Sequence, residues 1–94
     1  LKFVYADEAD LLNVALFGKT AAEWRKQNPS LKGNIRDYAT IEQLLVIANM
    51  ESYNAILIEQ NVMQCERLKQ LNNMAKSQLR VLEQSNSKFL KDNK

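Results

Sequence analysis

After Gly33 the chain contains no glycine and no proline, and this absence constrains the fold more than any other feature. Proline breaks a helix because it lacks an amide proton and clashes with the preceding turn, and glycine weakens a helix through its backbone freedom. Residues 35–94 therefore contain nothing that ends a helix outright. We expect this part of the chain to be almost entirely helical, with joints set by polar residues alone.

Apolar periodicity and capping residues place the individual helices. Thr20 with Glu23 and Thr40 with Gln43 have the form of capping boxes, and Gly18 stands where a helix is expected to end. These signals predict helices at roughly 6–17, 20–28, 40–59 and 63–84. The third could be continuous or split near 49–52, and residues 29–37 are expected to form a loop. The only strand-like alternation lies in residues 1–5.

The predicted fold is all-α, a small bundle of four to five helices with a long C-terminal helix. Ninety-four residues suffice for one small domain. We expect that domain to span residues 1–84, followed by a frayed basic tail at 85–94. The predicted core consists of Leu12, Leu16, Trp24, Ile41, Leu44, Leu45, Ala48, Leu68 and Leu71.

The residue types needed for most enzyme chemistry are missing. The chain has no histidine, the commonest general base and metal ligand, and its single cysteine, Cys65, is expected to be a buried small hydrophobe. Asp7, Glu8 and Asp10 are read as acids that complement a helix dipole rather than as metal ligands. We therefore predict no enzyme, no cofactor and no metal. The lone cysteine and the lack of a signal peptide or a membrane-length apolar run suggest a cytoplasmic protein.

Charge is distributed unevenly, with a net −3 over residues 1–66 and +5 over residues 67–94. A basic C-terminal helix could contact phosphates, although five excess charges make a weak footprint. The alternative interpretation is that these charges only keep one face of the helix in contact with water. The residues for a nucleic-acid contact would be Arg25, Arg36, Arg67, Lys69, Lys76 and Arg80.

A compact polar motif, Asn34, Arg36, Asp37 and Thr40, precedes the third predicted helix. It follows the turn residue Gly33, and it could serve as a structural ion-pair site or as a partner contact. We favour the structural role. Asp37 is then expected to accept backbone donors near the start of the third helix, and Arg36 to reach Asp10 or Glu8.

The last predicted helix carries an apolar stripe with helical spacing. A domain this small buries a limited share of its surface, so part of the stripe is expected to stay exposed in a monomer. The sequence thus predicts a homodimer or a protein partner at this stripe, unless the first and third helices cover it. The stripe consists of Leu68, Leu71, Ala75, Leu79 and Leu82.

Four segments together resemble the C-terminal region of bacterial proteins that carry a KilA-N domain, which occur in prophages and mobile elements. They are residues 5–18, Trp24-Arg25, residues 33–44 and residues 66–68. The KilA-N domain itself, thought to bind DNA, is not in this chain. The resemblance implies that DNA is bound through that N-terminal domain, and it assigns no catalytic role to this region.

Two functions follow as hypotheses. The first is a helical interaction or oligomerisation module beside a DNA-binding domain. The second is a nucleic-acid-binding element that uses the basic face of the C-terminal helix. The salt dependence of duplex binding distinguishes them, because phosphate contacts weaken steeply with salt.

Overall fold

The computed structural model describes residues 7–92, and the side chains of residues 7–85. This part of the chain is all-α and contains no strand, as predicted. The strand-like residues 1–5 lie outside the described residues. The elements in order are α1 (Glu8–Phe17), α2 (Ala21–Gln27), the 3-10 helix η1 (Ile35–Tyr38), α3 (Ile41–Glu59) and α4 (Gln64–Asp92).

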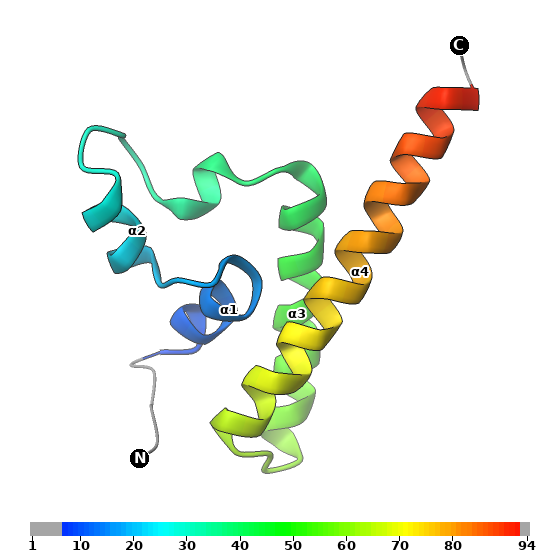
Figure 1. Cartoon of the computed structure of the whole chain (residues 1–94). Helices are drawn as coiled ribbons and strands as arrows, with labels where there is room; N and C mark the ends of the chain where they lie inside the picture. Colours follow the sequence, from blue (N-terminus) through cyan, green and yellow to red (C-terminus); the bar gives the residue numbers. More distant parts are fainter. Residues whose placement is uncertain (1–6, 93–94) are drawn as a thin grey trace.

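The two longest helices, α3 and α4, form an antiparallel hairpin joined by a short connection at residues 60–63 (Figure 1). Helix α1 packs against both of them, nearer the closed end of the hairpin. Helix α2 and η1 contact each other and extend away to one side of this three-helix unit. The core therefore lies where α1, α3 and α4 meet.

The predicted starts of α2 and α3 and the predicted end of α1 are correct, because the capping residues act as expected. The Thr20 hydroxyl accepts the Glu23 amide and the Glu23 carboxylate accepts the Thr20 amide, and Thr40 and Gln43 repeat the arrangement at the start of α3. Gly18 ends α1 with φ +80°, a left-handed conformation that favours glycine.

Three local differences from the predicted elements have simple causes. Helix α3 is continuous, because Asn49 and Ser52 lie on its exposed side and leave its backbone ladder intact. Helix α4 continues through residue 92 instead of fraying after 84, since no helix breaker follows. The predicted loop also contains η1, which Asn34 caps by accepting the Arg36 amide.

The observed core confirms the predicted core residues outside α3, whereas those predicted on α3 are wrong. Leu12, Trp24 and Leu71 are buried, and Leu16 and Leu68 are partly buried against the core. The predictions for the first half of α3 are wrong: Ile41, Leu44, Leu45 and Ala48 are exposed. The side of α3 that enters the core instead carries Val46, Ile47, Met50, Asn54 and Leu57.

The physical reason is that α3 is apolar on two opposite sides. At 3.6 residues per turn, Ile41, Leu45 and Ala48 lie about half a turn away from Val46 and Met50. Either side satisfies the spacing expected of a buried face. Packing with α1 and α4 covers one side and leaves the other in water.

Trp24 is the anchor of α2, as predicted. Its side chain is buried, and its ring lies 5.2 Å from the ring of Tyr38, centroid to centroid. The Tyr38 hydroxyl donates to the Lys32 carbonyl at 2.7 Å. These contacts hold the connection between α2 and α3 in a defined path.

Candidate protein-interaction surface

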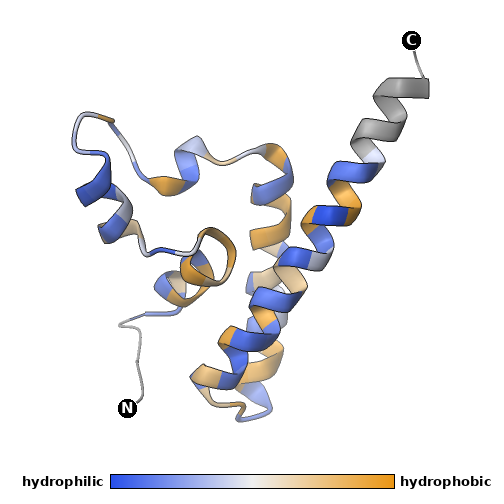
Figure 2. Ribbon diagram, viewed as in Figure 1, coloured by the Kyte–Doolittle hydropathy of each residue, from blue (hydrophilic) through white to orange (hydrophobic). Residues whose placement is uncertain are grey.

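From Ile41 to Ile56 the exposed side of α3 is a continuous uncharged surface, which we call the outer face, and exposed Glu59 follows it on the same side. All of its residues are exposed, and among its large side chains the exposed fraction ranges from 82% at Ile41 to 42% at Leu44. Figure 2 shows the apolar colouring that recurs along α3, whereas α4 alternates sharply between hydrophilic and hydrophobic. The outer face consists of Ile41, Leu44, Leu45, Ala48, Ser52, Ala55 and Ile56.

Small residues occupy the middle of the outer face and large ones lie toward its ends. Ala48 and Ser52 are one turn apart at the centre, while Leu44, Leu45 and Ile56 flank them. The absence of large side chains at the centre lets another helix approach closely there, because interaxial distance depends on the side chains at the contact.

Two shallow grooves border the outer face. The groove toward α4 lies between Leu45 and Asn49 on one side and Val81 and Leu82 on the other. The Asn49 amide nitrogen donates to the Gln78 side-chain oxygen at 3.0 Å across it. The groove toward α1 includes Ala55. A partner on the outer face would therefore also contact its margins.

The stripe predicted as a dimer surface on α4 packs within the single chain. Leu71 and Ala75 are buried in the core, and Leu68, Leu79 and Leu82 are partly buried against it. Helices α1 and α3 therefore cover Leu71 and Ala75 fully and the other three residues in part, which is close to the alternative that the sequence left open. Among the described residues, the exposed apolar side chains gather mainly on α3, although Val81 of α4 is exposed as well.

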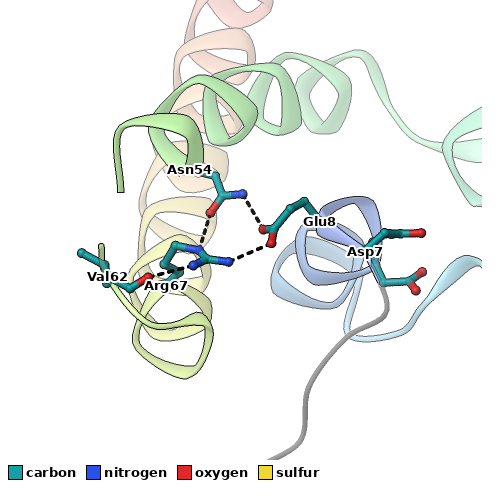
Figure 3. Close-up of polar contacts among 6 residues, drawn as sticks. Asp7, Glu8, Asn54, Val62 and Arg67 are labelled. Atoms are coloured by element: carbon teal, nitrogen blue, oxygen red, sulfur yellow. Dashed lines mark hydrogen bonds and ion pairs between the residues drawn. The ribbon is translucent and has the colours of Figure 1, made fainter. Parts of the chain in front are cut away.

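A buried arginine ties the start of α4 to α1 and α3 (Figure 3). The Arg67 side chain, 9% exposed, uses its Nε to donate to Asn54 Oδ1 at 2.9 Å, its Nη1 to the Val62 carbonyl at 2.7 Å and its Nη2 to Glu8 Oε2 at 2.8 Å. Asn54 Nδ2 donates to the other Glu8 oxygen at 2.8 Å. Every nitrogen of the guanidinium has a partner, so Arg67 acts in the structure rather than on a phosphate.

The residues of the polar motif before α3 contact other parts of the same chain, but the partner of Arg36 differs from the one expected. Arg36 Nε donates to Asn13 Oδ1 at 3.2 Å, and its Nη1 lies 3.6 Å from Glu51 Oε2. The predicted pairing with Asp10 or Glu8 is wrong, because Glu8 binds Arg67 instead.

Asp37 accepts a backbone donor, as expected, but this donor belongs to the start of η1 and not to the start of α3. Asp37 Oδ2 accepts the Asn34 amide at 2.9 Å and completes the cap of η1, while Thr40 caps α3. A methyl group at Gly33 would collide with the Asp37 carboxylate, so the glycine allows this close approach. The motif therefore holds the loop itself.

The remaining predicted cations lie in water. Arg25 is exposed on α2, and Lys69, Lys76 and Arg80 are exposed on the side of α4 turned away from the core. Cys65 is also exposed, so its predicted burial is wrong: it lies in the first turn of α4 on the solvent side.

The acidity of Glu23 is changed by its position at the start of α2. Hydrogen bonds from the backbone and side chain of Thr20 lower the pKa of Glu23 below its ordinary value of 4.5. Because this carboxylate is fully exposed and belongs to the capping box of α2, the shift reflects local capping.

Within the described residues, no group of three His, Cys, Asp or Glu side chains could hold a metal ion. The helices of this part of the chain are too short or too polar to cross a membrane. The surface that sequence reasoning missed is the outer face. Its signal was the presence of apolar residues on two opposite sides of α3, whereas a helix with a single covered side is apolar on that side alone.

Comparison of the chain with protein families, with characterised proteins and with solved structures gives no match. The resemblance to the region beside KilA-N domains therefore stays a prediction.

Proposed function

We propose that this chain is a non-enzymatic helical interaction module that binds a partner through the outer face of α3. The observation that supports the proposal is an uncharged apolar face on the solvent side of an otherwise packed helix. Contiguous exposed apolar patches often mark interaction sites in soluble proteins. Depletion of charge is also typical of the centre of an interface.

The resemblance to the region beside KilA-N domains supports a wider proposal. The module would belong to a DNA-binding protein of a prophage or mobile element and work in the cytoplasm. DNA would then be bound by the KilA-N domain, while this segment supplies protein contacts. Pairing two DNA-binding domains raises the overall affinity through effective concentration.

Photo-crosslinking in living cells tests the interaction module. A photoreactive residue replaces Ala48 at the centre of the outer face, and the control carries the same residue at exposed Ala22 on α2. We expect an adduct of defined mass from position 48 only, and its loss when Leu45→Glu is added. No adduct from position 48, or equal adducts from both positions, would contradict the proposal.

A second function remains as a proposal because three cations share one side of α4. Lys69, Lys76 and Arg80 follow helical spacing and are all exposed. If these residues contact phosphates, the logarithm of duplex affinity should fall with the logarithm of salt with a slope of about −2.7 for three contacts. Lys76→Gln should then reduce the slope by about 1, and a slope near zero would exclude this function.

A further inference from the structure

We infer that the occupant of the outer face is a second copy of this chain, with the two α3 helices antiparallel across a two-fold axis. This inference rests on the proposed function and names its partner. A two-fold interface uses the same patch on both copies, so the patch must fit itself. The outer face meets this requirement in size and in charge.

The sizes match when the axis passes at the level of residue 50. Ala48 of one copy then faces Ser52 of the other, so the helices cross where both side chains are small. In the same register Leu45 faces Ala55, which places a large residue against a small one, and Leu44 faces Ile56. Sliding the pair by one turn would leave apolar residues uncovered at both ends.

The charges of α3 favour the antiparallel orientation. The helix carries Glu42, Glu51 and Glu59 and no lysine or arginine. Glu59 lies five full turns after Ile41, on the side of the outer face, whereas Glu42 and Glu51 lie on its two opposite flanks. Parallel pairing would set the two Glu59 carboxylates against each other, whereas antiparallel pairing in this register places Glu59 beside Ile41 at the end of the contact. Antiparallel helices also set their macrodipoles against each other. The copies therefore avoid the repulsion between two Glu59 carboxylates.

The size of the face determines the expected affinity. Helix α3 has 19 residues, which gives a contact about 28 Å long. One helix pair with its groove margins falls at the low end of specific interfaces, below about 1,200 Å² in total. We therefore expect a concentration-dependent dimer with a dissociation constant on the order of micromolar to tens of micromolar.

Analytical ultracentrifugation of the whole chain tests the dimer. We expect the average mass to rise from monomer toward dimer over the micromolar to millimolar range. Ala48→Glu should keep the chain monomeric throughout, because it puts two carboxylates at the crossing point. The matched control Ala22→Glu, an exposed alanine on α2, should dimerise like the unchanged chain. A strictly monomeric unchanged chain, or equal dimerisation of both variants, overturns the inference.

Disulfide trapping tests the register. In a Cys65→Ser background, Ala48→Cys chains are mixed with Ser52→Cys chains and oxidised. Antiparallel pairing predicts that the mixed disulfide forms at least tenfold faster than one between Ala48→Cys and Ile41→Cys chains. The latter positions lie about 16 Å apart along the axis in the proposed register. Faster formation of the Ala48→Cys homodimer than of the mixed pair would overturn the antiparallel orientation.

The two proposals fail in different ways. An adduct at position 48 with the mass of another protein, combined with a monomeric chain in the centrifuge, would overturn the second copy and leave the interaction module standing. Absence of any adduct, together with a monomeric chain, would overturn both.

Discussion

Helices α3 and α4 form one hairpin, yet they differ in how much of their apolar surface a single chain buries. Helix α4 has one apolar side, which enters the core, and a solvent side that carries Lys69, Lys76 and Arg80. Helix α3 is apolar on both sides, and only one is covered. An amphipathic helix needs one neighbour, whereas a helix that is apolar all round needs cover on every side. A single chain therefore packs against the apolar side of α4 but leaves one apolar side of α3 exposed to water.

The largest expected effect separates the two sides of α3. Met50→Ala should lower the free energy of unfolding by about 2–5 kcal/mol, because Met50 is fully buried and its truncation leaves a cavity. Leu44→Ala on the outer face should cost less than about 1 kcal/mol. Urea denaturation of dilute samples measures both. Equal costs would mean that the outer face belongs to the folded core.

The second effect concerns the polar start of α4. Arg67→Ala should lower the free energy of unfolding by roughly 2–4 kcal/mol, because it leaves buried Asn54 and the Glu8 carboxylate without their donor. Arg36→Ala should cost less, about 1–2 kcal/mol, because its partner Glu51 is half exposed and the buried group that loses a donor is Asn13. Thermal melts of the two variants compare them. A larger loss for Arg36→Ala would place the main polar tie on the loop instead.

A smaller effect compares one alanine from each helix. Ala75→Leu should cost about 1–3 kcal/mol, since Ala75 is buried in the core and the added atoms overpack it. Ala48→Leu should change the monomer by less than about 0.5 kcal/mol, because position 48 is exposed. Denaturant midpoints at low concentration give the values. A similar cost at both positions would remove the contrast between the helices.

The smallest effect lies outside the hairpin and serves as its control. The folded pKa of Glu23 is lowered, so the capping of α2 contributes stability above pH 4.5 and loses it as the pH falls through the folded pKa. Tryptophan fluorescence of Trp24 should report this change before the hairpin unfolds. Glu23→Gln keeps a capping side chain that does not titrate, and it should abolish the early change. A change that persists in that variant must come from another group.

The sequence predicts the boundaries of α1 to α3 well because they depend on local chemistry. Thr20, Thr40 and Gly18 act within three or four residues of their own positions. The single apolar side of α4 was also identified correctly, since no competing stripe exists on that helix. The difference lies in what packs on this side: a second chain was expected, whereas α1 and α3 of the same chain pack there.

The rest could not be predicted because it depends on which surfaces meet in space. Two apolar sides of α3 fit the same periodicity, and only the positions of α1 and α4 choose between them. The partners of Arg67 and Arg36 are equally non-local: Glu8 and Asn13 come from α1, far away in sequence. The outer face is therefore a product of tertiary packing rather than of local pattern.

The contact between Glu8 and Arg67 also sets the order in which the protein can be completed. The two residues are 59 positions apart, and synthesis at about 5–20 residues per second adds that length in roughly 3–12 s. During this interval the buried side of α1 has no α4 to pack on. Helix α4 thus secures α1 only once α4 itself has left the ribosome, and we expect the core between α1, α3 and α4 to assemble no earlier.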